Sequence, residues 1–248
     1  MHWLVRRRNW RLLKLHWLCT QSGAMVPMKQ SSADLSSGNQ VALLDEPAAT
    51  PAETCAEMLR LVPRDYFQLR GVLVQLPKGN GADRSSTLAR MVTGRRHRAL
   101  LLYLLLLTCW PWLESRREPL PATAWVRALT ATDRGAPTWS PSTLSRVWAE
   151  LEELGLIEKR EREGRAVRVR PRREDGREAY DAPGGRRDLM NTYFVLPLDF
   201  WRDETFAKLT LPGLAMLLII AKETNPNLTS TGAGGAEGVG AGQRRVGG

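Results

Sequence analysis

The sequence predicts a mainly α-helical protein with a small amount of β-structure. Three features of its 248 residues support this prediction. The apolar run from 99 to 113 has the length of a buried helix, and the stretch from 140 to 154 has helix start and stop residues around an apolar stripe. Directly after that stretch, arginines alternate with apolar residues as in a β-strand. A chain of this length can form one or two domains with cores of their own.

Residues 1–60 are predicted to be a flexible basic and linker region. Trp3, Trp10 and Trp17 recur every seven residues among arginines, as in an amphipathic helix on a membrane surface. An equally good interpretation is a basic extension that precedes a functional start near Met25 or Met28. The segment then becomes rich in serine, glycine and proline, and we expect a short helix from 52 to 61 but no core element before about residue 60.

The next elements follow from local pattern. Aromatic and β-branched residues from 66 to 76 predict a strand, and KGNGAD (78–83) predicts a turn that lacks the spacing of a phosphate-binding loop. A short helix is expected at 86–91 and a buried helix at 97–110, which Pro111 should end. At 15 residues the apolar run falls short of the about 20 that a membrane-spanning helix needs. Another short helix is expected at 120–130.

The segment from 140 to 154 has the most complete helix signals in the chain. Ser140 can accept hydrogen bonds from free N–H groups, Pro141 suits the first helical position, and Gly155 suits a left-handed residue at the end. The apolar stripe consists of Leu144, Val147, Trp148, Leu151 and Leu154. We expect its tryptophan, like Trp125 and Trp139, to be a packing residue.

A two-stranded hairpin is expected directly after this helix, from 156–162 and 165–170. Because AVRVR (166–170) alternates apolar residues with arginine, one face should pack and the other should present positive charge. The stretch 159–173 contains eight basic and two acidic residues, a net charge of +6.

The whole chain has 36 Lys and Arg against 26 Asp and Glu, a net charge of +10, which favours a polyanionic partner. Cys19, Cys55 and Cys109 are too far apart in the sequence for a CxxC pair, and an odd number argues against a disulfide framework. The three histidines have no partners at metal-ligand spacing. We therefore expect a cytoplasmic protein that is not an enzyme and that holds no metal or cofactor.

The order helix, short helix, turn, capped helix and basic hairpin resembles a winged helix-turn-helix, and SPSTLSRVWAELEELGLIEKREREGRAVRV resembles the recognition helix and wing of bacterial regulators. The resemblance covers residues 95–173. It implies that the start of the second helix enters the major groove, with base contacts from Ser142, Thr143, Ser145 and Arg146. The wing would supply contacts to the DNA backbone from Lys159, Arg160, Arg162, Arg165, Arg168 and Arg170. A generic helix and hairpin with a solvated charged face is the alternative.

A weak internal repeat begins near residue 191. Tyr193-Phe194 echo Tyr66-Phe67, TFAKL (205–209) echoes TLARM (87–91), and the apolar stretch from 215 echoes the one from 99. We therefore expect four regions: the N-terminal region 1–60, a winged-helix domain at 61–190, a truncated second winged-helix-like unit at 191–229, and a disordered glycine-rich tail at 230–248.

Together these features predict a protein that binds specific sequences of double-stranded DNA, by preference a bacterial transcription regulator. Tandem winged helices are also similar to replication initiators of plasmids or mobile elements, which is the first alternative. A protein-interaction or membrane-surface module that uses the Trp/Arg N-terminus is the second, less favoured one. A homodimer is left open.

Overall fold

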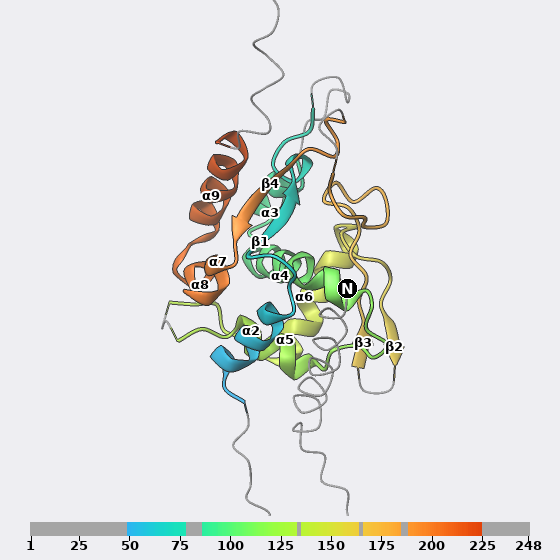
Figure 1. Ribbon diagram of the computed structural model, residues 1–248, viewed down its shortest axis with the longest axis vertical. Coiled ribbons are helices and arrows are strands. Elements are labelled where there is room, and N and C mark those ends of the chain that lie inside the picture. Colours follow the sequence, from blue (N-terminus) through green and yellow to red (C-terminus); the bar gives the residue numbers. More distant parts are fainter. Residues whose placement is uncertain (1–48, 78–85, 133–134, 164–165, 185–187, 225–248) are drawn as a thin grey trace, which may run out of the picture.

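The computed structural model describes residues 49–77, 86–132, 135–163, 166–184 and 188–224, which form helices and two small sheets around one long helix (Figure 1). That helix, α4 (His97–Leu113), is apolar around its whole circumference, and every residue from Ala99 to Cys109 is buried. Such a helix is stable only when other elements surround it. The predicted class, mainly α with a small amount of β, is confirmed.

The sequence predicts that helix α4 ends at Pro111, but the structure shows that the helix continues past it. It continues to Leu113, and the amide of Glu114 still donates to the carbonyl oxygen of Trp110 at 3.0 Å. Proline removes the one hydrogen bond that its own N–H would donate to the carbonyl of Leu107. Only two helical residues, Trp112 and Leu113, follow Pro111, and the loss of that single bond does not end the helix.

The two helices after α4 match the prediction. Helix α5 (Ala122–Leu129) and helix α6 (Pro141–Glu153) both pack on the core, and Trp125 and Trp148 meet edge to face with ring centroids 5.4 Å apart. The side chain of Ser140 accepts a hydrogen bond from the backbone of Thr143, and Gly155 has a φ of 73°. The start and end signals of α6 are therefore confirmed.

Helix α2 (Pro51–Arg60) corrects the expectation that no core element precedes residue 60. Thr50 and Glu53 form a reciprocal capping box, which fixes the start of the helix. Met58 and Leu59 are 1% and 2% exposed, and α2 lies against α5. Apolar residues three and four positions apart give this short helix a buried stripe, which the polar linker before it obscured.

Two antiparallel sheets accompany the helices. Strand β1 (Tyr66–Arg70) pairs with β4 (Tyr193–Pro197), with Gln68 opposite Val195. Strand β1 is shorter than predicted because the 3-10 turn η1 (Gly71–Leu73) follows it. The predicted hairpin is formed by β2 (Glu161–Glu163) and β3 (Ala166–Arg168), and a backbone bond from 158 to 170 extends it.

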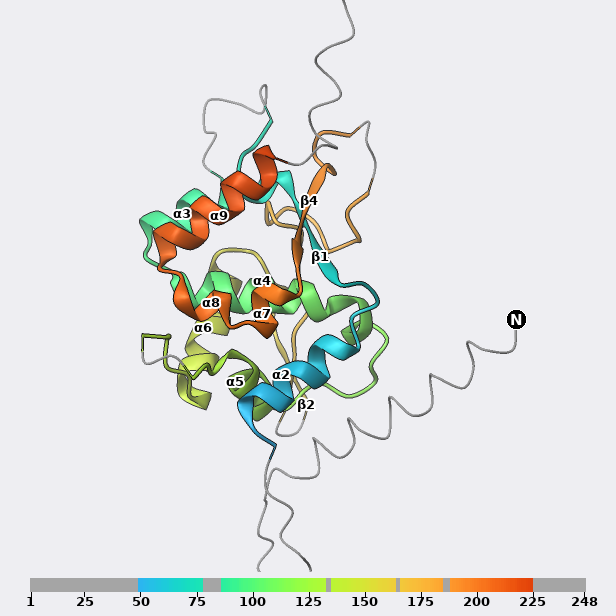
Figure 2. The ribbon, with the colours of Figure 1, turned by 60° about the vertical axis from the view of Figure 1, so that its left-hand side comes forward.

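The last described segment packs on the same hydrophobic core as the rest of the chain. Helices α7 (Asp199–Arg202), α8 (Thr205–Lys208) and α9 (Leu211–Glu223) follow β4, and α9 lies beside α3 (Thr87–Thr93) (Figure 2). Trp201 is buried, and its indole N–H donates to the hydroxyl of Thr108 in α4 at 3.1 Å. Residues before and after the predicted boundary at 190 thus belong to one hydrophobic core.

Several predictions concern residues outside the described ranges: the tryptophan-rich N-terminus, the turn at 78–83, the tail from 230 and Arg165 in the hairpin turn. Among the described helices, none is long and apolar enough to cross a membrane.

Candidate nucleic-acid interface

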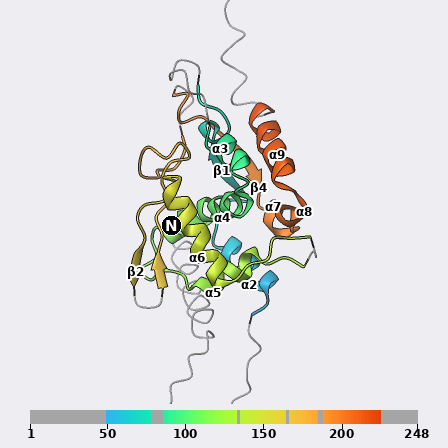
Figure 3. The same cartoon turned by 180° about the vertical axis from the view of Figure 1, so that it is seen from behind.

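Helix α6 has one buried and one exposed face, and the exposed face holds the residues predicted to contact bases. Leu144, Val147, Trp148 and Leu151 are buried. Ser142, Ser145, Arg146 and Ala149 are exposed, and α6 lies in front of α4 when the molecule is seen from behind (Figure 3). The helix therefore presents two small hydroxyl side chains and a long cation to solvent in its first turns.

The four residues predicted to contact bases differ in exposure and in the hydrogen bonds that hold their side chains. Thr143 is half-buried, and its Oγ1 accepts a hydrogen bond from Ser140 at 3.0 Å. Ser142 is exposed, with its Oγ 2.9 Å from that of Ser140. The side chain of Arg146 is 67% exposed, and its one ion pair with another described residue is a long contact of 3.9 Å to Glu150. Arg146 is thus the residue with the greatest reach, whereas Thr143 belongs to the helix cap.

Arg160 attaches the hairpin to α6. Its backbone N–H donates to Oε1 of Glu152 at 2.7 Å, and its guanidinium donates to both carboxylate oxygens of the same residue. A further N–H of Arg160 donates to the carbonyl oxygen of Ser145 at 3.3 Å. These bonds fix the hairpin beside the exposed face of α6, so Arg160 positions the hairpin in addition to adding charge.

Arg168 is held on the hairpin itself. Its guanidinium forms an ion pair with Glu163 at 2.5 Å and donates to the backbone carbonyl oxygens of Arg116 and Arg117. With these three acceptors, one on the hairpin and two on the loop after α4, the Arg168 side chain is only 23% exposed. Its bonds therefore link the hairpin to the loop after α4.

The other predicted wing cations remain available to a ligand. Lys159, Arg162 and Arg170 are exposed and form no ion pair with another described residue. They supply three positive charges along the hairpin. Arg165 lies outside the described residues.

The link between Arg160 and Glu152 should depend on pH. The hydrogen bonds from Arg160 lower the pKa of Glu152. Because the folded pKa lies below the ordinary value of about 4.3, the link stabilises the docked hairpin above that pH and is lost as the pH falls through the folded pKa. We expect the amide of Arg160 to lose protection from hydrogen exchange below about pH 4. In Glu152→Gln that protection should not change with pH, and the same loss in both proteins would contradict the prediction.

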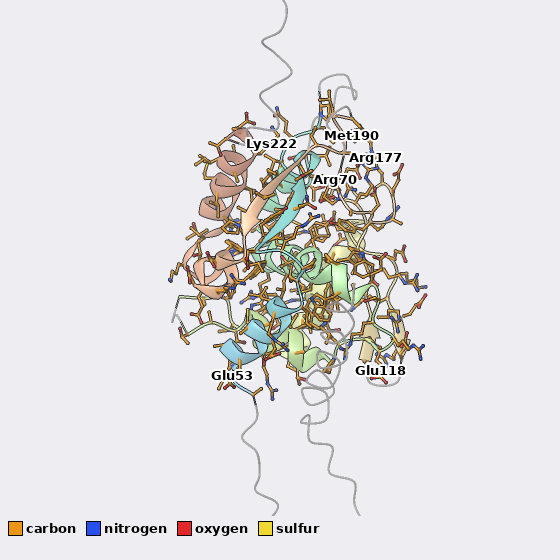
Figure 4. The ribbon with its side chains drawn as sticks, viewed as in Figure 1. Glu53, Arg70, Glu118, Arg177, Met190 and Lys222 are labelled. Carbon is orange, nitrogen blue, oxygen red and sulfur yellow. The ribbon has the colours of Figure 1, made fainter. Side chains whose placement is uncertain are left out.

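A buried ionic cluster, which sequence reasoning missed, holds the connection after the hairpin. Arg70 and Glu174 are both fully buried, and their side chains meet at 2.9 Å. Glu174 also accepts from the backbone N–H of Arg70, while the guanidinium reaches Asp181 at 2.5 Å and Asn191 at 3.1 Å. Figure 4 labels Arg70. The Tyr180 ring lies against the guanidinium. The cluster ties Glu174, Asp181 and Asn191 to β1 and holds the connection that follows the hairpin.

The described residues include metal-ligating side chains and two cysteine thiols. They contain no group of three or more His, Cys, Asp or Glu side chains placed to hold a metal ion. Cys55 and Cys109 are buried free thiols, and burial raises the pKa of Cys55 to about 11. A thiol with a raised pKa is a poor nucleophile at neutral pH.

Comparison of the chain with models of protein families, with curated proteins and with solved structures finds no match to any of them. The geometry of α6 and its surroundings is therefore the basis for assigning a function.

Proposed function

We propose that this chain binds double-stranded DNA as a winged helix-turn-helix protein and acts as a regulator of transcription without enzymatic activity. In this proposal α4, α5 and α6 are the three helices, and the hairpin β2–β3 is the wing. The exposed face of α6 enters the major groove, where Ser142, Ser145 and Arg146 reach base edges. Lys159, Arg162 and Arg170 contact phosphates beside it.

The main support for the proposal is the position and pairing of the acidic residues of α6. Glu150, Glu152 and Glu153 all lie in its second half, and each is paired with an arginine: Arg146 at 3.9 Å, Arg160 at 3.0 Å and Arg96 at 3.2 Å. The first half of the exposed face has no carboxylate at all. A helix that approaches phosphates needs this arrangement, because unpaired carboxylates would repel the DNA backbone.

The salt dependence of binding tests the proposal. If four to six phosphates are contacted, the logarithm of the affinity for duplex DNA should fall against the logarithm of salt concentration with a slope of about −4 to −5. The double variant Arg162→Ala with Arg170→Ala should reduce the magnitude of that slope by about 2. Fluorescence anisotropy with a labelled duplex measures both. Absence of duplex binding at low salt, or an unchanged slope in the variant, would overturn the proposal.

One observation favours the alternative of replication initiation. The residues that echo one another occupy matching places: Tyr66 and Tyr193 each begin a strand, and Thr87 and Thr205 each begin a helix. The two strands also pair with each other antiparallel, which suits an internally duplicated unit. A footprint over iterated sites at a plasmid origin would support this alternative, and a single promoter operator would support transcription regulation.

A further inference from the structure

A basic hollow lies on the side of α6 that faces away from the hairpin. Its volume is about 720 Å³, and it is bounded by the start of α4, by α6, and by the junction of α8 and α9. Ser145 and Glu152 of α6 contact the hairpin, whereas Arg146 and Glu150 line the hollow. In Figure 3 the hairpin and α8 accordingly lie on opposite sides of α6.

Five cations and one carboxylate line this hollow. The cations come from three places in the chain: Arg95, Arg96 and Arg98 at the start of α4, Arg146 in α6, and Lys208 at the end of α8. The carboxylate is Glu150. So many like charges around one concave surface repel one another, and an anion placed between them would relieve that repulsion.

The bonds of these cations leave their charge available. Arg98 donates to the carbonyl oxygen of Thr138 at 3.2 Å, and Lys208 donates to that of Asp203 at 2.8 Å. Both are neutral acceptors. Arg95 is exposed and forms no ion pair with another described residue. Of the five, only Arg96 and Arg146 contact carboxylates, which belong to α6.

The start of α4 adds to the positive potential. No side chain caps this 17-residue helix, so its first N–H groups and its dipole favour an anion. His97, which lines the hollow, has a buried Nε2 without a hydrogen-bond partner among the described residues. Burial, together with the charge of Arg98, lowers the pKa of His97, so the imidazole is neutral near pH 7.

We propose that this hollow binds a phosphodiester group of the DNA backbone, on the strand that lies across the major groove from the wing. This inference rests on the proposed DNA binding by α6. A helix in the major groove, which is about 12 Å wide, has a phosphate backbone on each side. The wing supplies cations on one side of α6, and the hollow supplies them on the other, from α4 and α8.

The test compares three double variants that each remove two positive charges. The hollow variant is Arg95→Gly with Lys208→Gln, and the wing variant is Arg162→Ala with Arg170→Ala. The control variant is Arg64→Gln with Lys222→Gln, at sites before β1 and in the last turn of α9. Figure 4 labels Lys222. Arg95 has a left-handed φ of 52°, which glycine adopts without strain, so the hollow variant should not melt at a lower temperature than the wild type.

The hollow variant should reduce the magnitude of the salt slope by about 1, the contribution of one phosphate, and the wing variant by about 2, while the control variant leaves it near the wild-type value. A wild-type slope in the hollow variant, with a reduced slope in the wing variant, would overturn this site and leave the proposed function intact. Equal reductions of the slope in all three variants would show that only net charge matters, and would also overturn the assignment of this site. Failure of the wild type to bind duplex DNA would overturn the proposed function itself.

Discussion

Replacing Glu174 by alanine is expected to lower the free energy of unfolding by about 3 kcal/mol or more. Among the described residues, Glu174 is the carboxylate that is fully buried with Arg70, whose guanidinium is itself fully buried, and the substitution removes it. It also removes the acceptor of the Arg70 backbone N–H. Asp181 remains in contact, but its side chain is 63% exposed and cannot replace a buried carboxylate. Urea denaturation followed by circular dichroism measures the change.

The double variant Glu174→Ala with Arg70→Met provides the control for this prediction. It removes the buried charge together with its partner, and so it should be more stable than Glu174→Ala alone. The remaining partner, Asp181, is exposed enough to be solvated without Arg70. A loss below about 1 kcal/mol in the single variant, or a double variant that is less stable than the single one, would contradict this account.

This cluster also shows which parts of the fold the sequence could not predict. In β1 the residues Leu69 and Arg70 are both fully buried, although they are adjacent and should face opposite sides of a strand. The alternating pattern alone places Arg70 on the solvent side. Its partner lies 104 residues away in a stretch without regular structure. No local pattern connects the two.

The sequence predicts well those elements whose ends and faces are determined by residues close by in the sequence. Helix α6 carries its own cap, its own apolar stripe and its own terminating glycine, so its bounds agree with the structure to within one residue. Helix α4 was predicted from apolar residues alone, and its end was misplaced because the effect of Pro111 depends on how much helix follows it. Helix α2 was predicted, but its burial against α5 was not, because that contact joins distant parts of the chain.

The same distinction applies to the candidate interface. The exposed residues of α6 follow from helical spacing, and the structure places them on one face. The roles of the hairpin arginines do not follow from spacing, because Arg160 and Arg168 are held by Glu152 and by carbonyl groups after α4. Lys208 joins the basic hollow because the fold brings the end of α8 and the start of α4 to the same concave surface.

Replacing Trp148 by alanine is expected to lower the free energy of unfolding by about 3 to 5 kcal/mol. The side chain is 4% exposed and meets Trp125 edge to face, so its loss leaves a cavity between α5 and α6. Arg146 lies two positions earlier on the exposed face of the same helix. Arg146→Ala should change stability by no more than about 0.5 kcal/mol.

For DNA affinity the order should be reversed, with the larger loss in Arg146→Ala and the smaller loss in Trp148→Ala. If Arg146 contacts a base, Arg146→Ala weakens specific binding by about 1 to 3 kcal/mol. Trp148→Ala should bind almost normally at temperatures where it remains folded, because its side chain points into the core. Thermal denaturation and anisotropy titrations on the same preparations measure both quantities. Equal losses of stability, or a folded Trp148→Ala protein with the larger binding defect, would contradict the proposed roles of Trp148 in the core and Arg146 at the DNA, because that proposal requires α6 to have a packing face and a separate face for DNA.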